Sequence, residues 1–322
     1  MYIKLTHLFE PERPRADVVV WRVSEESRQS LERRLSQAAP AAPAIQLPSR
    51  HALTRYFQSY YDKFHKHFPM LHMPTHAIDE APPELSVAIA AIGAQYRFEL
   101  SNGLELYRAA KYVVWEKILH HQRQASGLSA VHTSNDDAYG SPDDICAMIL
   151  LMAFASWTDK PDLLCDALQL QMPLTHALRL DGLHEASNGG QEAHWAHWIQ
   201  HERRRRAKLI GFVYLNVVAV TYDTPIMLFA NEIHLSLPCC AAEWEVTSEA
   251  EWRQAIQQKA PAVSFEGSLQ WLLHGDGHGL STTTPVALFV LLQAILQKIM
   301  LARQLQSAGE PALREADLEF LE

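Results

Sequence analysis

Three histidines in the stretch EAHWAHWIQHERRRRAKLIGF, residues 192–212, carry imidazole groups of the kind that bind transition metals in proteins. His194, His197 and His201 follow one another at intervals of three and four residues, which places them on one face of a helix. No cysteine or carboxylate on that face is placed to complete a zinc site. We therefore expect a solvated histidine face here, and not a metal site.

The same stretch contains the pattern HWIQH, which is similar to the HxxEH pattern of one class of metallopeptidases. That chemistry needs a carboxylate as general base, and Gln200 stands at the position of the catalytic glutamate. An amide cannot accept a proton from a metal-bound water, so the pattern does not predict a protease.

Four consecutive arginines, residues 203–206, could bind nucleic acid or act as a nuclear-import signal. At about 100° per residue the run wraps around a helix, with Arg204 on the side opposite to Arg206, and offers little continuous basic surface. The whole chain has 28 Lys+Arg against 37 Asp+Glu, a net charge of -9. Because phosphate binding needs a cationic surface, we expect a structural role for these arginines.

Glu202 and Arg206 are i,i+4 neighbours in the middle of the apolar face of this helix. That face is formed by Trp195, Trp198, Ile199, Leu209, Val213, Asn216, Val217 and Val220. A charge inside a core needs a partner, so the pattern predicts a buried ion pair between the two residues. Such a pair contributes specificity or a switch more plausibly than net stability.

Other catalytic patterns are incomplete or missing. Terpene and prenyl-transfer enzymes hold magnesium with aspartates spaced along one helix face, but the stretch from Asp143 lacks the second acid, and Asp143 and Asp144 are typical of a helix start. The stretch HGDGHG, residues 274–279, could hold a metal, but its composition favours a glycine-rich connection between helices. It also lacks the glycine spacing of the dinucleotide-binding fingerprint. The sequence has no GxSxG, P-loop or HExxH motif. We expect a protein that is not an enzyme.

The composition suits an intracellular helical protein: 48% of the 322 residues are hydrophobic, enough for one large domain or two ordinary ones. Its four cysteines form no CxxC pair, which favours free thiols in a reducing compartment: Cys146, Cys165, Cys239 and Cys240. The N-terminus lacks the apolar core of a signal peptide. The longest apolar segment, Val286 to Leu301, is short for a membrane span and carries two glutamines and a lysine, which predicts a buried helix and no membrane contact.

The helices that must position these residues can be placed by periodicity. Residues 1–48, with an Ala/Pro stretch near their end, are expected to form a poorly ordered leader or linker, and residues 49–322 a helical domain that is incomplete at its C-terminus. An aromatic stripe predicts a helix from Ser49 to Phe68. Further helices are expected at 84–98, 104–121, 143–157, 161–180 with an interruption at Pro173, along the His/Arg stretch, after Ser248, and from Thr284. Residues 231–240 alternate apolar and polar side chains and are expected to form an extended arm on an all-α body.

Several of these stretches together resemble the fungal-specific transcription factor domain, the middle homology region of fungal zinc-cluster and zinc-finger regulators. In that family an aromatic helix runs into a P-h-L-H-x-P-T turn, matched here by Pro69, Leu71, His72, Pro74 and Thr75. A W-x-x-W-x-x-x-E-x-R-R helix is matched by Trp195, Trp198, Glu202, Arg204 and Arg205. A later P…E-x-x-x-x-L-P-C…W element is matched by Pro225, Glu232, Leu237, Pro238, Cys239 and Trp244. The segments PPELSVAIAAIGAQYRF and LYRAAKYVVWEKI are similar to the two helices after the turn, so the resemblance spans about 50 to 300.

The resemblance implies a nuclear transcription regulator of a fungus, with a helical domain that responds to partners or ligands. In the family a separate zinc module reads DNA. No cysteine precedes Cys146 here, so this sequence holds neither a six-cysteine cluster nor a cysteine–histidine finger, and we expect no cofactor in the chain. The expected structural and regulatory core is Trp195, Trp198, Glu202, Arg206, Pro238, Cys239 and Trp244.

Three functional hypotheses remain open. The first is the regulatory domain of a transcription factor, with DNA contacted only through the family's zinc module. The second is a co-regulator that binds no DNA and pairs with a full-length relative, as a homodimer or heterodimer. The third is a sensor with a small-molecule pocket among Trp195, Trp198 and Phe212.

Overall fold

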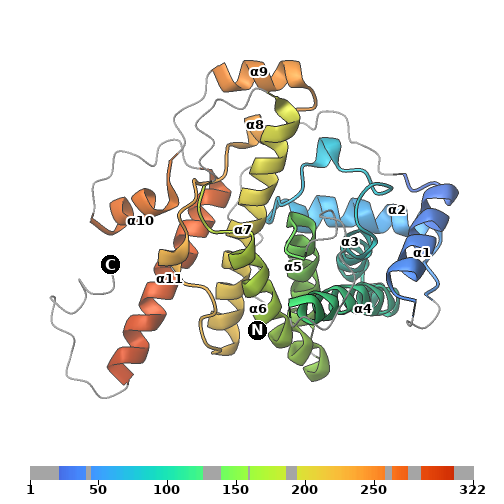
Figure 1. The fold of residues 1–322 in the computed structure, drawn as a ribbon, viewed down its shortest axis with the longest axis horizontal. Helices are drawn as coiled ribbons and strands as arrows, with labels where there is room; N and C mark the ends of the chain where they lie inside the picture. The colour runs from blue at the N-terminus through green and yellow to red at the C-terminus, as the bar shows by residue number, and fades with distance from the viewer. Residues whose placement is uncertain are drawn as a thin grey trace.

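The computed structural model describes residues 22–40, 45–125, 139–158, 160–185, 194–257, 263–274 and 284–307. Within these ranges the chain forms eleven α-helices with short 3-10 and π-helical turns and no β-strand. Most of these helices pack around one large apolar core (Figure 1). The predicted all-α fold is confirmed.

The expected leader contains a folded helix, α1 (Glu25–Ala38). The Ser24 side chain caps its first turn by accepting a hydrogen bond from the Ser27 amide, and Leu31 and Leu35 are fully buried in the main core. Poor order is therefore the wrong expectation for this helix, which is attached to the domain by the two leucines and by Arg34, whose guanidinium donates to the Ile78 and Ala81 carbonyls. Residues 1–21 and 41–44 lie outside the described ranges.

The predicted aromatic helix is α2 (Arg50–Ser59), which continues as a π-helical turn (Tyr60–His65) and buries Tyr56, Tyr60 and Phe64. It crosses α3 (Pro83–Tyr96) at Gly93, where an added Cβ atom would lie only 1.9 Å from the backbone oxygen of Tyr56. Only glycine permits this approach of two helix backbones.

The turn between α3 and α4 (Leu100–Ala125) lies at residues 97–99, earlier than the predicted turn at 101–103. Phe98 takes a left-handed conformation with φ of 61°, and the Glu99 amide donates back to the Ala94 carbonyl at 3.0 Å. A left-handed phenylalanine is uncommon, and the turn-forming residues Asn102 and Gly103 drew the prediction to the first turn of α4 instead.

Helix α5 (Pro142–Ser156) is almost wholly buried, and Ser141 with Asp144 forms a capping box at its start, so the assignment of Asp143 and Asp144 to a helix start is confirmed. Helix α6 (Pro161–Leu180) continues through Pro173, and the predicted interruption is wrong. The carbonyl oxygen of Pro173 accepts a hydrogen bond from the Tyr139 hydroxyl at 2.6 Å. Helix α7 (Trp195–Tyr222) packs against α5, α6 and α11 (Pro285–Ser307).

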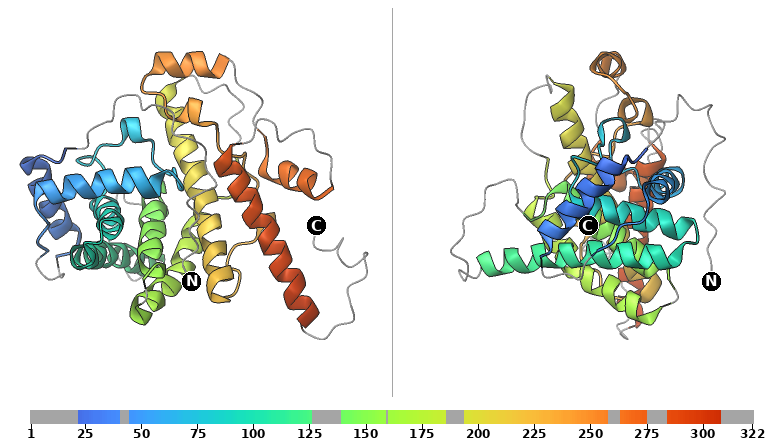
Figure 2. Two further views of the ribbon diagram at one scale, coloured as in Figure 1. Left: turned by 180° about the vertical axis from the view of Figure 1, so that it is seen from behind. Right: turned by 90° about the vertical axis from the view of Figure 1, so that its right-hand side faces the viewer.

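The segment between α7 and α11 contains the expected arm. After a 3-10 turn (Ala230–Glu232) the chain runs extended, with the His234 amide donating to the Leu183 carbonyl at 2.8 Å and the Leu237 amide donating to the Val263 carbonyl at 2.8 Å. Only isolated bridges form, so the arm is extended without building a sheet among the described residues. Short helices α8 (Ala241–Trp244), α9 (Glu249–Gln257) and α10 (Phe265–His274) follow; α8 and α9 lie near the N-terminal end of α7 (Figures 1 and 2).

Candidate functional site

The histidine face of α7 points outward, as its spacing predicts. His194 and His197 are exposed and His201 is half-buried. Within the described ranges no three His, Cys, Asp or Glu side chains are grouped so that they could hold a metal ion. Of the stretch HGDGHG, residues 274–279, only His274 lies among the described residues.

The arginine run is engaged by carboxylates of the protein itself. The ion pairs join Arg203 to Asp143 at 2.5 Å, Arg204 to Asp181 at 3.1 Å, Arg205 to Glu185 at 2.9 Å and to Glu202 at 2.5 Å, and Arg206 to Glu202 at 2.7 Å. Each guanidinium thus has a carboxylate partner, which leaves little positive potential for phosphate groups.

Glu202 is fully buried on α7, and its two oxygens are surrounded by donors. Oε1 accepts from Nε of Arg206 at 2.7 Å and from the Cys239 amide at 2.9 Å, while Oε2 accepts from Nη1 of Arg205 at 2.5 Å. Burial raises the pKa of this carboxyl, but Arg206 and Arg205 outweigh that effect and hold the pKa below its ordinary value. Glu202 is therefore an anion inside the protein at neutral pH.

Arg206 links α7 to three other segments. Nη2 donates to the Cys239 carbonyl at 2.8 Å and Nη1 to the Pro69 carbonyl at 3.4 Å, and the guanidinium carbon lies 4.3 Å from the centre of the Trp244 ring. These contacts reach the turn after the aromatic helix, the arm, and α8. We call Glu202, Arg206 and the backbone of Cys239 the ion-pair node.

The ion-pair node adjoins a second, smaller core of Trp198, Ile199, Trp244 and Trp252, separate from the main core. The Trp198 ring lies 6.2 Å from that of Trp244 and 5.7 Å from that of Trp252, measured between centroids. We call these four residues, with the half-buried Trp195, the tryptophan cluster. It attaches α8, α9 and the end of the arm at Cys239 to the N-terminal half of α7.

His72 joins the tryptophan cluster to the turn after the aromatic helix: its ring centroid lies 4.8 Å from that of Trp244 and 5.9 Å from that of Trp195. Its Nδ1 atom is 2.8 Å from the Thr75 hydroxyl. Burial, with the nearby charge of Arg203, lowers the pKa of His72 to about 4, so the ring is neutral at physiological pH.

The structure brings together six of the seven residues expected to form a core, namely Trp195, Trp198, Glu202, Arg206, Cys239 and Trp244, through the contacts above. Pro238 is buried directly before Cys239 and, as a proline, has no amide to compete for the carboxylate. On the apolar face of α7, Val220 is 43% exposed, so its predicted burial is wrong; it lies in the last turn of the helix. The expected core omits Arg205 and Trp252, although Arg205 belongs to the motif that resembles the family and its i,i+3 spacing from Glu202 was a usable signal.

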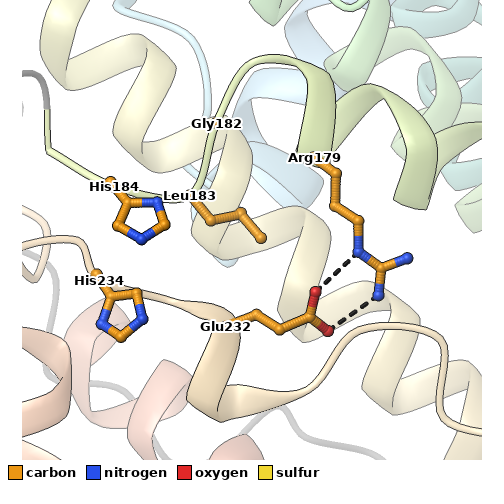
Figure 3. Close-up of a pocket in the computed structure, with 6 residues that line it drawn as sticks. All are labelled: Arg179, Gly182, Leu183, His184, Glu232 and His234. Atoms are coloured by element: carbon orange, nitrogen blue, oxygen red, sulfur yellow. Dashed lines mark hydrogen bonds and ion pairs between the residues drawn. The ribbon is translucent and has the colours of Figure 1, made fainter.

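A pocket of about 310 Å³ lies where α6 ends and the arm begins, lined by Arg179, Gly182, Leu183, His184, Glu232 and His234 (Figure 3). Arg179 and Glu232 form a two-pronged ion pair at 2.8 and 2.9 Å. The rings of His184 and His234 stack with centroids 4.7 Å apart. None of the residues expected to line a pocket, Trp195, Trp198 and Phe212, borders this one.

One family model matches the chain: the fungal-specific transcription factor domain, over residues 55–309. Neither the curated proteins nor the solved structures compared with the chain include a match. The matched range contains the ion-pair node, the tryptophan cluster and the pocket.

Proposed function

Because the chain belongs to the family of fungal-specific transcription factor domains, we propose that it is a regulatory region of a fungal transcription regulator, in which the ion-pair node controls the position of the arm. The coarse assignment to transcription regulation follows from the family. The role of the node and a nuclear location are the parts that we add.

The observation that carries the proposal is the double use of Glu202 and Arg206. Both side chains bind the backbone of Cys239, through its amide and its carbonyl, while they bind each other. A buried ion pair adds little net stability compared with apolar packing, but its geometry is demanding. The arm is therefore held in one position or released, which is the behaviour required of a two-state element.

Contacts on either side of the arm support the idea that the arm is held in one position or released. The tryptophan cluster behind Cys239 is small and distinct from the main core. A partner or ligand that moves α8 would separate Trp244 from Arg206 and leave the guanidinium without its aromatic partner. The ion-pair node is thus placed to transmit a local displacement to α7, which spans the domain.

A reporter assay tests the proposal. The chain is fused to an unrelated DNA-binding module in a fungal host, and Glu202→Gln is compared with Arg204→Gln, since Arg204 pairs at the protein surface and is 52% exposed. We expect Glu202→Gln to change reporter output at equal protein abundance, while Arg204→Gln leaves it unchanged. A well-folded Glu202→Gln protein with unaltered output would refute the role of the node.

The second candidate is a co-regulator that acts without contacting DNA. The net charge of -9 and the pairing of all four arginines favour protein partners over direct DNA contact. Capture of a related transcription factor by the intact chain from the nuclear fraction of a fungus, lost in Glu202→Gln, would support this function; capture only of unrelated proteins would refute it.

The third candidate, a small-molecule sensor, draws its support from the pocket of Figure 3. Its accessible lining is mostly apolar, with polar groups from His184, His234 and the paired Arg179 and Glu232, which suits a small molecule that has both apolar and polar parts. A thermal-shift screen with metabolites tests this function, with His184→Ala as the binding-deficient variant. No stabilisation across a broad panel would refute it.

A further inference from the structure

Glu185 contacts both the arm and α7, although it belongs neither to the pocket lining nor to the ion-pair node. It lies in the segment after α6, directly after the pocket residue His184. Its backbone amide donates to the His234 carbonyl of the arm at 3.1 Å. Its Oε1 atom accepts from the Ser236 amide at 2.7 Å. One residue thus binds the arm twice, through its backbone and through its side chain.

The side chain of Glu185 also binds Arg205 of α7. Nε of Arg205 donates to Oε1 of Glu185 at 2.9 Å, and Nη2 donates to Oε2 at 3.3 Å. A further donor of the same guanidinium, Nη1, binds Oε2 of Glu202 at 2.5 Å. Arg205 is therefore one cation shared by two carboxylates. With Arg206 these side chains form a row of alternating charge that runs from the pocket side of the arm to the ion-pair node.

The contacts of Glu185 repeat those of Glu202. In both cases the Oε1 atom of a glutamate accepts from Nε of an arginine on α7 and from a backbone amide of the arm. The two amides, of Ser236 and Cys239, are three residues apart. We call Glu185, Arg205 and the Ser236 amide the second clamp. The arm is therefore held at two points by a single row of charges.

The second clamp is joined to the wall of the pocket. The His234 amide donates to the Leu183 carbonyl at 2.8 Å, and the rings of His184 and His234 lie against each other across the pocket (Figure 3). His184 is covalently adjacent to Glu185, and His234 lies two residues before Ser236. A change in the separation of the two rings is therefore transmitted to the second clamp.

The charges of the second clamp are only partly exposed to water. The Glu185 side chain is 42% exposed and that of Arg205 is 20% exposed, while Glu202 is fully buried. Burial raises the pKa of Glu185, but the hydrogen bond and the charge of Arg205 outweigh that effect and hold the pKa below its ordinary value. Both glutamates are therefore anions at neutral pH. Because they share one guanidinium, the energies of their contacts with Arg205 are not independent.

We propose that Glu185 is a positioning residue that couples the pocket to the ion-pair node, through the arm and through the arginine that it shares with the node. The coupling rests on the proposed function, in which the node controls the position of the arm. It gives the pocket a regulatory role: a small molecule that separates the stacked rings weakens the hold on Ser236, and with it the hold on Cys239.

Hydrogen exchange of the full chain, resolved to single amides of the arm, tests the coupling at the node. Glu185→Gln keeps an oxygen for the Ser236 amide but removes the charge that binds Arg205. We expect exchange of the Cys239 amide, which Glu185 does not touch, to become about tenfold faster. The matched control is Glu249→Gln, which removes an ion-paired carboxylate of similar exposure, 45%, and should leave this amide unchanged. Unchanged exchange at Cys239 in Glu185→Gln overturns the proposal.

The pocket side is tested with His184→Ala, which removes the ring stack. We expect exchange at Cys239 to become about threefold faster, the size of a lost ring contact. The same substitution in a Glu185→Gln chain should add nothing, because the coupling residue is already impaired. An equal increase in both backgrounds would mean that the effect bypasses Glu185, and this result overturns the proposal.

The reporter assay separates failure of the coupling from failure of the proposed function. Glu185→Gln should shift reporter output in the same direction as Glu202→Gln, and the double variant should show less than the sum of the two shifts. If Glu202→Gln changes output and Glu185→Gln does not, the coupling is overturned and the node keeps its role. If neither changes output while exchange at Cys239 responds as expected, the proposed function fails and the coupling within the fold is supported.

Discussion

Glu202 shows how much a single residue can contribute to stability, because its buried charge is stabilised by Arg205 and Arg206 on the same helix and by the Cys239 amide. Replacing it with alanine leaves Arg206, 3% exposed, as an unpaired buried cation. We expect Glu202→Ala to destabilise the domain by about 3–5 kcal/mol, which is the usual cost of removing one partner of a buried pair. Arg204→Ala should cost at most about 1 kcal/mol, since its ion pair is at the surface. Thermal melts of both variants check this; equal and small effects would contradict the node.

His72 predicts a dependence on pH. Its folded pKa of about 4 lies below the ordinary value of 6.5, so the unfolded chain binds a proton more readily between these values. The contribution of neutral His72 to the free energy of unfolding is complete above pH 6.5 and decreases as the pH falls toward 4. Since one pKa unit corresponds to about 1.4 kcal/mol, the lower proton affinity of His72 in the folded state should reduce the free energy of unfolding by about 1–2 kcal/mol at pH 5. Urea unfolding at pH 7 and 5 should show a smaller pH difference in His72→Gln than in the wild-type chain; an identical difference would exclude His72 as the cause.

At the scale of elements, α1 attaches to the domain through two buried leucines and through Arg34, whose guanidinium donates to the Ile78 and Ala81 carbonyls. Leu31 is fully buried, so Leu31→Ala removes core contacts and leaves a cavity, at an expected cost of about 2–5 kcal/mol. Arg33 on the exposed side of the same helix is the matched control, and Arg33→Ala should change stability by at most about 0.5 kcal/mol. Denaturant unfolding of both variants decides whether α1 is part of the domain; a neutral Leu31→Ala would exclude it.

Most helices could be predicted from the sequence because their apolar periodicity is long and their caps are explicit. The stripe of α2 and the capping box at Ser141 are examples. Helix α1 was missed because it buries only two leucines beside an Ala/Pro-rich stretch. The turn at Phe98 was misplaced because a left-handed phenylalanine has no sequence signal, whereas Asn102 and Gly103 do.

The ion-pair node could be predicted only in part, for a related reason. The i,i+4 spacing of Glu202 and Arg206 revealed their pairing within one helix. Their bonds to Cys239 and Pro69 join segments more than thirty residues away, and no local pattern specifies such contacts. The family resemblance identified Cys239 and Trp244 but gave no contacts between them and α7.

At the scale of the whole molecule, charge placement decides how the chain can meet DNA. The net charge of -9 repels a polyanion, and the one concentrated basic run is neutralised by Asp143, Asp181, Glu185 and Glu202. We therefore expect no sequence-dependent binding of duplex DNA by this chain at about 150 mM salt, since specific binders need several phosphate contacts.

A salt titration gives this prediction a sharp test. Weak residual binding at low salt should disappear as salt rises, without preference between duplex sequences. The same titration on Asp143→Asn and Asp181→Asn, which release Arg203 and Arg204 from their carboxylates, should show stronger low-salt binding than the wild-type chain. Tight binding of a particular sequence by the wild-type chain would contradict both the charge argument and the co-regulator function. Its absence, with reporter output still controlled by Glu202, would assign regulation to protein contacts of the helical domain.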